Sequence, residues 1–419
     1  MRLTVKLTDV VELSKLKREP KWMLAWRLNA YYCLLFATCP SWSYISLSTT
    51  EFGARLSRVD RDNCNLFCVG AGLADVDVVY NTSSVYLRVS KELKLFRIKF
   101  VSITKAVLIW ASSVRRYMGS VVSHNDNYFS MLNSCLFTDG TYINVAAGVN
   151  SPAALSTYFK ISSNCAAQFE RTLIIVGRGG SATYFEGCNA TKLNRNTLHA
   201  AVVELIINQA GNLKYTTVQN WYTSEQFGVY NLVTKRALCL GTSSKVVWVQ
   251  VEIGANATWK YPSSVLLGVN STSEFYSLNV GNKKQRVDTG TKVFHLARGT
   301  ASTILAKSIL FGQCDNSFRA LISLSAQDCR NYTRCDALVA SEACVNRIIP
   351  TIVVNSWPIV LEYETLSSYV TASQLRYCEQ RGISEVSALK LIVIGYSHEV
   401  SKQLPLLASL EVARILFAC

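Results

Sequence analysis

The stretch VWVQVEI, residues 247–253, carries the clearest local signal of the fold. Aliphatic residues occupy every second position, and larger or polar residues fill the positions between them: Val247, Val249, Val251 and Ile253 against Trp248, Gln250 and Glu252. A period of two residues is typical of a β-strand, whose side chains alternate between two faces. Gly254 follows at once, as expected where a strand gives way to a turn.

Similar short runs, rich in β-branched and aliphatic residues, lie on either side of this stretch at residues 172–176, 201–207, 304–311 and 347–354. Each has the length of one strand, and each is followed by Gly or Asn. From about residue 142 to residue 364 no helical periodicity interrupts these runs. The region therefore predicts a β-sandwich, a β-barrel or a β-solenoid. Its length favours the solenoid, although the sequence repeat itself is weak.

The N-terminal part of the chain has a different pattern. Residues 1–40 are expected to be helical, because their apolar residues recur at helical spacing: Met23, Leu24, Trp26, Leu28 and Tyr31. Residues 41–120 are irregular, apart from a short helix expected at residues 107–117.

The C-terminal part is again predicted to be helical. Thr371 or Ser373 can cap a first helix, which ends at Gly382. Ser384 caps a second helix, and Gly395 is expected to stop it. The apolar residues extend around much of the circumference of these helices, so they need a partner surface, either the end of the solenoid or another subunit.

A third helix is expected at residues 406–417, directly after Pro405. The predicted organisation is therefore a helical and irregular N-terminal region at 1–120, a β core at 121–366, and a helical C-terminal region at 367–419.

Composition excludes several classes of protein. With 419 residues, 49% of them apolar and only 17% charged, the chain is not disordered. The uncharged apolar run at residues 106–113 is far shorter than the ~20 residues that a membrane-spanning helix needs. Residues 22–39 are apolar but contain Arg27 and follow a charged segment, unlike a signal peptide. We therefore expect a protein that works where it is made, with its 14 cysteines mostly as thiols.

The formal charge is +15, from 43 Lys and Arg against 28 Asp and Glu. A basic face can bind nucleic acid or an anionic membrane surface. The basic residues here come singly or in pairs such as Arg115–Arg116, without interleaved aromatic residues. A solvated surface biased toward Lys and Arg is the preferred interpretation, and no nucleic-acid partner is expected.

The common catalytic motifs are missing from the sequence. It contains no G-x-x-x-x-G-K-[ST] phosphate loop and no paired Cys-x-x-Cys spacings for zinc. Most cysteines are expected to pack as small core residues. Cys188 differs because it stands two residues after a carboxylate, Glu186. Cys335 differs because it follows Arg334, a cation that we expect to lower the pKa of the thiol.

Several segments closely resemble the SufB family, the scaffold subunits of the SUF system that assembles iron–sulfur clusters. The resemblance runs in register from about residue 117 to the end, and its motifs are QFERTLI (168–174), YFEGCNA (184–190), LHAAVVEL (198–205), TTVQNWY (216–222), YNLVTKR (230–236), WKYP (259–262), DTGTK (288–292), RNYTRCD (330–336) and QRGISE (380–385). A further patch at residues 19–31 is similar to an N-terminal element of the family.

The resemblance implies a right-handed parallel β-helix with helical N- and C-terminal regions. It also implies that the protein is a scaffold and not itself an enzyme. A SufC-type ATPase would hydrolyse ATP and dock on the C-terminal helices, where we assign Leu389, Ile392, Leu404 and Pro405 to docking. The other expected partners are a SufD-type paralogue, or a second SufB copy, and a cysteine desulfurase or sulfur-transfer protein.

The resemblance assigns residues one by one. Cys188 matches the cysteine that accepts persulfide sulfur. Cys335 and Glu364 match the residues at the SufB–SufD interface where the cluster forms. The residues assigned to the sulfur route are Lys160, Gln219, Trp221 and Lys235. The expected cargo is a transient iron–sulfur cluster of the 4Fe-4S type, with reduced flavin as a further cofactor of the complex.

The sequence departs from the family pattern at several positions. Tyr363 stands where the family has His, which removes an imidazole ligand. Lys160 and Ser162 replace the usual Arg and Asn. His199 and His295 match family positions, and we interpret both as structural.

Two other functions remain open. A SufD-like structural subunit of the same complex would not need Cys188, Cys335 and Glu364. A β-solenoid carbohydrate-active enzyme would need paired carboxylates on an exposed face and an export signal. The missing leader fits a plastid-encoded protein, which the divergent N-terminal region favours, or a bacterial cytoplasmic one.

Overall fold

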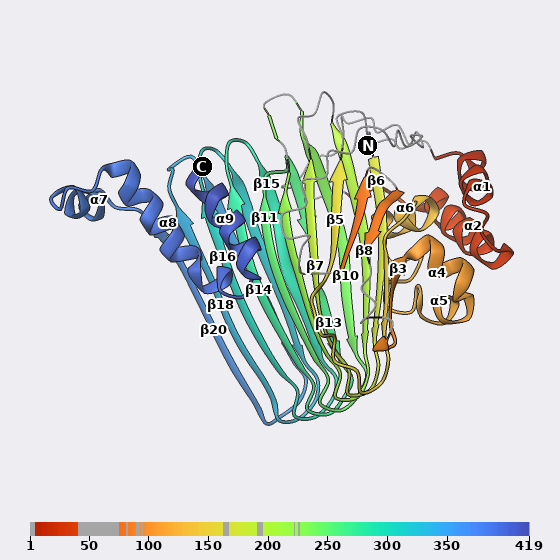
Figure 1. The fold of residues 1–419 in the computed structure, drawn as a ribbon. Helices are drawn as coiled ribbons and strands as arrows, with labels where there is room; N and C mark the ends of the chain where they lie inside the picture. Colours follow the sequence, from red (N-terminus) through yellow and green to blue (C-terminus); the bar gives the residue numbers. More distant parts are fainter. Residues whose placement is uncertain are drawn as a thin grey trace.

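The computed structural model describes residues 5–40, 75–80, 83–88, 93, 95–161, 167–190, 196–221, 223–224 and 227–418. Ser162, one of the departures from the family pattern, lies outside the described residues. The strands run side by side in one long stack, with helices at the N-terminal end and along one flank (Figure 1).

The strands form two sheets. The first contains, in spatial order, β2 (Ser83–Arg88), β1 (Asp75–Tyr80), β5 (Leu155–Ile161), β7 (Ser181–Ala190), β9 (Asn212–Asn220), β11 (Lys245–Ile253), β14 (Thr272–Gly281), β16 (Ala301–Leu310), β18 (Cys329–Val339) and β20 (Ile359–Tyr369). The second contains β19 (Val345–Val354), β17 (Asp315–Leu324), β15 (Arg286–His295), β12 (Ala257–Lys260) with β13 (Ser263–Leu266), β10 (Val229–Cys239), β8 (Thr197–Ile207), β6 (Ala167–Val176), β4 (Thr141–Val145) and β3 (Ile98–Ser102).

From β5 onward, consecutive strands alternate between the two sheets, apart from β12 and β13, which both lie in the second. Each turn of the chain therefore adds to both sheets, and each strand pairs in parallel with the strand one turn later. This is a parallel β-solenoid, which confirms the fold predicted from the sequence and excludes the sandwich and the barrel. In such a stack, residues at equivalent positions of successive turns lie directly beside one another.

The alternation in β11 has a physical cause, because both faces of this strand are buried but against different surroundings. Trp248 points into the solenoid and packs in the interior core. Val249 and Val251 point outward, into a cluster that includes Val400 from the C-terminal helices. The aliphatic face of the strand thus lies beneath helices, and the interior receives the aromatic and polar residues.

The N-terminal helices α1 (Leu7–Leu16), α2 (Lys21–Phe36), α4 (Ile103–Ile109), α5 (Ala111–Tyr117) and α6 (Tyr128–Leu136) gather at the first turns of the solenoid (Figure 1). The helical prediction for residues 1–40 is confirmed. The helix expected at 107–117 is instead two helices that meet at Trp110, whose backbone leaves the helical conformation. Arg27 anchors α2 from a fully buried position, through an ion pair of 2.7 Å with Glu19 and a hydrogen bond to the carbonyl of Phe137.

The C-terminal helices are α7 (Ala372–Glu379), α8 (Glu385–Ser401) and α9 (Leu406–Ala418). Thr371 and Ser384 cap the first two, as predicted. The expected stop at Gly395 is wrong, because α8 continues to Ser401. A glycine inside a helix costs only about 1 kcal/mol, and the burial of Val393 and Val400 on either side of it holds the helix together.

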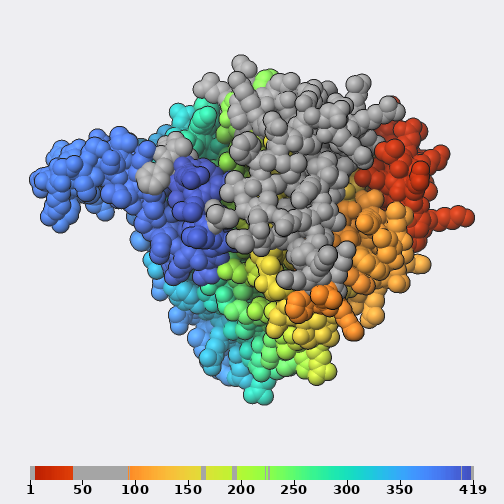
Figure 2. All heavy atoms as spheres, viewed as in Figure 1, coloured from red at the N-terminus to blue at the C-terminus, as the bar shows by residue number. Residues whose placement is uncertain are grey.

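Helix α8 packs along β14 and β16, whereas α7 has no buried residue and projects from the body (Figures 1 and 2). None of the helices in the described parts of the chain is long and apolar enough to span a lipid bilayer.

The last turn of the solenoid is open. Strands β19 and β20 each pair with only one neighbouring strand within the described residues. Their large apolar side chains are correspondingly exposed: Ile352, Val353, Val354, Val360, Leu366 and Tyr369. An unpaired sheet edge with apolar side chains is a surface that proteins normally cover.

Candidate functional site

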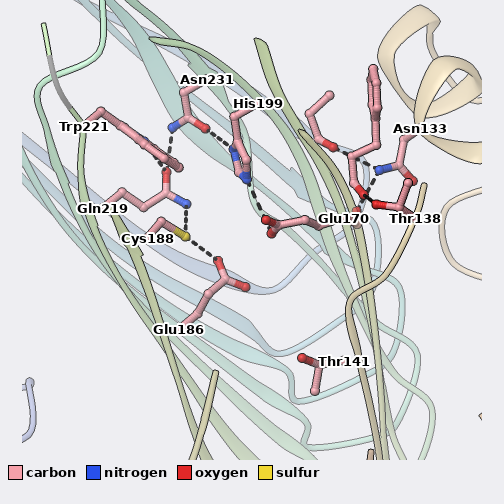
Figure 3. Close-up of polar contacts among 12 residues, drawn as sticks. Asn133, Thr138, Thr141, Glu170, Glu186, Cys188, His199, Gln219, Trp221 and Asn231 are labelled. Atoms are coloured by element: carbon pink, nitrogen blue, oxygen red, sulfur yellow. Dashed lines mark hydrogen bonds and ion pairs between the residues drawn. The ribbon is translucent and has the colours of Figure 1, made fainter. Parts of the chain in front are cut away.

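The candidate site is a polar network inside the solenoid, centred on Cys188 (Figure 3). Cys188 lies on β7 with 3% of its surface exposed, and its neighbour on β9 is Gln219. Because equivalent positions lie side by side, the Gln219 amide points at the thiol, with Nε2 at 3.6 Å from Sγ. Glu186 faces the same interior two residues earlier, and its Oε1 is 3.9 Å from the same sulfur.

Gln219 connects Cys188 to the opposite sheet. Its Oε1 accepts hydrogen bonds from Trp221 Nε1 at 3.2 Å and from Asn231 Nδ2 at 2.6 Å. Asn231 lies on β10 and bonds His199 Nδ1 at 2.8 Å, and His199 Nε2 lies 3.4 Å from Glu170 Oε2. A continuous line of polar contacts therefore crosses the interior from Cys188 to Glu170, as Figure 3 shows.

A second group of polar contacts holds Glu186. Lys235 Nζ lies 3.0 Å from Glu186 Oε1, and the Tyr215 hydroxyl donates to the other carboxylate oxygen. Lys235 also lies over the Tyr215 ring, 4.7 Å from its centre. Burial alone would raise the pKa of Glu186, but Lys235 and the Tyr215 hydrogen bond outweigh it and hold the pKa below its ordinary value.

One turn further along, Lys260 pairs with Glu252, and both side chains are buried. Lys260 Nζ also donates to Thr217 Oγ1 at 3.2 Å, and Asn231 Nδ2 lies 3.2 Å from Glu252 Oε2. The two lysine–glutamate pairs therefore belong to the same connected network as Cys188. Buried charges are stable in this way only when each meets an opposite charge or a hydrogen-bond partner.

The network sets the protonation of the groups around Cys188. Burial raises the pKa of the Cys188 thiol well above its ordinary value, and the carboxylates of Glu186 and Glu170 raise it further. Burial also raises the pKa of Glu170 to about 7, against the opposing charge of His199. For His199, burial disfavours the charged form, but Glu170 outweighs this and the pKa is raised. Glu170 and His199 thus form a coupled pair that titrates together.

A pocket of about 340 Å³ opens at the ends of the strands next to Cys188. Its lining includes Ala190, two residues after Cys188, and Trp221, which donates to Gln219. Ile415 of α9 closes one side. Trp221 therefore belongs both to the pocket lining and to the network around the buried thiol.

Of the residues assigned to the sulfur route, Gln219, Trp221 and Lys235 meet in this network, but Lys160 does not. Phe159 is the neighbour of Cys188 on β5 and faces the interior with it. Lys160 is the neighbour of the exposed Asn189. Because successive side chains of a strand point to opposite faces, Lys160 lies on the outer face of the sheet.

Cys335, on β18, points into the interior of the solenoid, and its neighbour on β16 is Ala306. The expectation that Arg334 lowers its pKa is wrong, because adjacent residues of a strand point to opposite faces. Arg334 instead pairs with Asp336 at 2.9 Å on the outer face. Burial raises the pKa of Cys335 to about 12, with Tyr363 acting in the opposite direction. The Tyr363 hydroxyl lies beside the thiol, and no described residue is its partner at hydrogen-bond geometry.

Glu364 is exposed on β20, where its neighbour on β18 is Arg334, while the neighbour of Cys335 is Thr365. The thiol of Cys335 and the carboxylate of Glu364 therefore lie on opposite faces of the sheet in this chain. Within the residues that the structure describes, no three His, Cys, Asp or Glu side chains gather closely enough to hold a metal ion.

The residues assigned to partner docking mostly contact the chain itself. Leu389 and Ile392 are half-buried against the cluster between α8 and the sheet, and Leu404 is buried in it. Pro405 is half-buried at the start of α9. The apolar residues that α8 and α9 present to solvent are others: Val386, Leu391, Leu406 and Leu410.

Sequence reasoning noted Glu186 only as the carboxylate near Cys188, and it treated His199 as structural. It did not select the other members of the network: Glu170, Asn231, Glu252 and Lys260. A usable signal was present for Glu186 and for Asn231. Glu186 stands two residues before Cys188, so both point to the same face of a strand. Asn231 stands four residues before Lys235 and shares its face for the same reason. Glu170 and Glu252 reach the site only through the stacking of distant turns.

Comparison with known proteins shows which family the chain is related to. The family model described as "SUF system FeS cluster assembly, SufBD core domain" matches residues 159–396. The chain is 38% identical to the iron–sulfur cluster assembly SufBD family protein slr0074 of Synechocystis, over 97% of this chain and 91% of that protein. It is 37% identical to the chloroplastic SufBD family protein ABCI8 of Arabidopsis thaliana, over 94% of this chain and 76% of that protein. It is 35% identical to the iron–sulfur cluster assembly protein SufB of Plasmodium falciparum, over 82% of this chain and 74% of that protein.

The matched range contains the Cys188 network, the pocket lining contributed by the strands, and Cys335. The resemblance drawn from short motifs is thus confirmed over most of the chain. The chain belongs to the SufBD family of the SUF system for iron–sulfur cluster assembly.

Proposed function

We propose that the protein is the scaffold of a SufBCD-type complex, accepts persulfide sulfur at Cys188 and supports cluster assembly at the open end of the solenoid. The observation that carries this proposal is the setting of Cys188. Its thiol is buried, contacts Gln219 and Glu186, and lies next to a pocket lined by Trp221. A sulfur acceptor needs such a place, because a persulfide must be shielded from solvent and from other thiols.

The transfer step is a thiol–persulfide exchange. The Cys188 sulfur, as thiolate, attacks the outer sulfur of a persulfide on a cysteine desulfurase or sulfur-transfer protein. The sulfur–sulfur bond of the donor breaks, its thiolate leaves with the proton that Cys188 lost, and Cys188 carries the persulfide. The reaction consumes no electrons. Because burial and the nearby carboxylates keep the thiol protonated, the step requires the site to open toward the pocket first.

Three residues of the solenoid interior would assist this transfer step: Gln219, Trp221 and Lys235. Gln219 donates toward the sulfur, Trp221 lines the pocket and donates to Gln219, and Lys235 supplies the positive charge nearest to Glu186. Lys160, on the outer face, would contribute to the donor's docking surface and not to the interior route.

Cluster assembly is proposed at the last turns. Cys335 lies one turn from the open edge formed by β20, and Glu364 is exposed on that edge strand. A SufD-type paralogue or a second copy of the chain would cover the edge and supply further ligands. Thiolate with a carboxylate is a suitable ligand set for iron in a nascent cluster, here of the 4Fe-4S type. Because Cys335 and Glu364 face opposite sides of the sheet, both would reach one cluster only if the edge strand β20 rearranges. The conversion of persulfide sulfur to sulfide takes two electrons, and reduced flavin in the complex is the proposed source.

ATP hydrolysis would come from a SufC-type ATPase docked on the C-terminal helices. The outward apolar residues of α8 and α9 are the surface for it, and Leu389, Ile392, Leu404 and Pro405 support that surface from beneath. We place the complex in a plastid, with a bacterial cytoplasm as the other compartment, because the relatives include chloroplastic and cyanobacterial proteins.

Sulfur acceptance is tested by incubating the purified chain anaerobically with a cysteine desulfurase and cysteine, followed by alkylation and mass spectrometry. We expect persulfide on the Cys188 peptide and its loss in Cys188→Ser. Cys239→Ser is the matched control, because Cys239 is equally buried in the solenoid but lies outside the network. A Cys188→Ser variant that accepts as much sulfur as the wild type would overturn this assignment.

Cluster assembly is tested by anaerobic reconstitution of the complex with iron and sulfide, followed by visible absorption. We expect the sulfur-to-iron charge-transfer band to disappear in Cys335→Ala and to weaken in Glu364→Gln. Cys329→Ala, on the same strand and equally buried, should keep the band. A full band in Cys335→Ala would favour the second candidate, a SufD-like structural subunit, which the separation of Cys335 from Glu364 also supports.

A further inference from the structure

Two cysteines that have no part in the proposed sulfur route stand side by side near the open end of the solenoid. Cys314 immediately precedes β17, and Cys344 immediately precedes β19. The next residues along, Asp315 and Val345, are paired neighbours in the sheet. The backbone continues this register, because the Val345 N–H donates to the Cys314 carbonyl at 2.9 Å. The two thiols therefore occupy equivalent corners of successive turns.

The distance between the two sulfur atoms is 3.5 Å, which is van der Waals contact. Neighbouring strands lie about 4.8 Å apart, within the range of Cα separations that a disulfide spans. The sulfur atoms need to approach by only about 1.5 Å to reach bonding distance, which side-chain rotation can supply. No rearrangement of the turns is required.

The two thiols are chemically unequal. Cys314 is buried and donates a hydrogen bond to the sulfur of Cys344. Burial raises the pKa of Cys314, and the contact with Cys344 raises it further. Cys344 is half-buried at the surface, with its sulfur 3.4 Å from the Gly312 carbonyl oxygen. Cys344 is thus the sulfur that solvent reaches.

We propose that Cys314 and Cys344 are a reversible disulfide site that fastens the last two turns of the solenoid to each other. The oxidant is a low-molecular-weight disulfide such as oxidised glutathione. The Cys344 thiolate attacks it, which forms a mixed disulfide and releases one small thiol. Cys314 then attacks the Cys344 sulfur, its proton passes to the departing thiolate, and the second small thiol leaves. Two protein thiols are oxidised, and one small disulfide is reduced to two thiols.

The position of this disulfide means that it would restrain the edge strand β19. Among the residues that the structure describes, strand β19 pairs with β17 on one side only, which leaves its outer edge open. A link at its first residues holds this end strand to the rest of the solenoid and limits its fraying. The link therefore acts on the surface where a partner subunit is proposed to bind, without touching Cys188 or Cys335.

The test is equilibration of the whole chain with defined ratios of reduced and oxidised glutathione, acid quenching, alkylation and peptide mass spectrometry. In oxidising buffer we expect a peptide that joins Cys314 to Cys344, lighter by two hydrogens, and its complete loss on return to reducing buffer. Amide hydrogen exchange in β19 should slow on oxidation. The slowing should be absent in Cys314→Ser and in Cys344→Ser.

Cys378→Ser is the matched control, because Cys378 is half-buried like Cys344 but stands on the projecting helix α7. It should leave the joined peptide unchanged. If Cys344 instead retains glutathione as a stable mixed disulfide in wild-type protein, with no joined peptide, the proposal is overturned. Peptide mass spectrometry of the wild-type protein distinguishes the two outcomes even where a serine variant fails to fold.

Discussion

Burying charged side chains inside a β-solenoid costs free energy unless each is paired, and the residues around Cys188 show how this cost is met. Glu186 is held by Lys235 and by the Tyr215 hydroxyl, so its charge persists in the interior. The same carboxylate raises the pKa of the Cys188 thiol. Burial is the main cause of the raised thiol pKa, Glu186 adds to it, and Lys235 acts in the opposite direction.

Removing one partner of the buried pair should be costly. Lys235→Met leaves the Glu186 carboxylate without its cation, and we expect the free energy of unfolding to fall by about 3–5 kcal/mol. Lys245→Met removes a surface ion pair with Glu274, whose two side chains are 38% and 29% exposed, and should cost about 1 kcal/mol or less. Urea unfolding of both variants measures this, and equal losses would contradict the role given to Lys235.

The Glu170–His199 pair predicts a pH dependence of stability. The pKa of Glu170 is raised from 4.5 to about 7, so between these values the folded chain holds a proton that the unfolded chain has released. Stability therefore falls as the pH rises through this window. The raised pKa of His199 acts in the same direction, because its contribution is lost as the pH rises through the folded-state pKa.

We expect this decline, at most about 3 kcal/mol from Glu170, between pH 5 and pH 8. The fall of the free energy of unfolding with pH should be weaker in Glu170→Gln. The exposed Glu362→Gln is the control and should follow the wild-type curve. Urea unfolding at several pH values provides the measurement, and parallel curves for wild type and Glu170→Gln would exclude the pair as the cause.

At the scale of single elements, the sequence predicted strands well and the faces of strands less well. The alternation in β11 was visible because helices cover one face and the polar interior meets the other. β8 shows no such alternation, because all its residues are buried. Arg334 was expected to act on Cys335, although adjacent residues of a strand point to opposite faces and the spacing alone rules this out. Lys160 was assigned by resemblance, and its outward direction follows from the pairing of Phe159 with Cys188.

Two glycines, Gly395 within α8 and Gly254 directly after β11, offer a matched pair of substitutions. Gly395→Ala should raise the free energy of unfolding by up to about 1 kcal/mol, because a Cβ there meets nothing within 4 Å and alanine favours the helix. Gly254→Ala should destabilise severely, because its φ is +80° and a Cβ would stand 1.9 Å from the Trp221 carbonyl oxygen. Thermal unfolding compares them, and a destabilised Gly395→Ala would show that α8 depends on that glycine.

At the scale of the whole molecule, the solenoid brings together residues far apart in the chain by stacking equivalent positions. Asn231 and His199 are register partners on successive turns, and Glu170 reaches His199 from the preceding turn, two residues beyond the position paired with it. Short motifs matched to a family identified other members of the network, Gln219, Trp221 and Lys235, because each motif is one continuous stretch of sequence. The separation of Cys335 from Glu364 could not be predicted from their spacing, because it depends on the register of β18 against β20.

The open end of the solenoid should control assembly with the partner subunit. Val354, on β19, and Val360, on β20, are 47% and 52% exposed, on edge strands that pair on one side only within the described residues. Replacement of either by lysine places a charge where a partner strand would pack, and charges on edge strands oppose such pairing. We expect the dissociation constant for the SufD-type partner, or for self-association, to rise at least ~10-fold, a change of about 1.4 kcal/mol.

Analytical ultracentrifugation measures this dissociation constant at several protein concentrations. Leu16→Lys is the matched control, because Leu16 is also exposed but lies on α1, at the opposite end of the stack (Figure 1). It should leave association unchanged, and so separates a local effect from a general gain in charge. Association that survives both edge substitutions, or that is lost in Leu16→Lys, would place the partner elsewhere. Cys335 and Glu364 would then have to complete their ligand set without a subunit on the open edge.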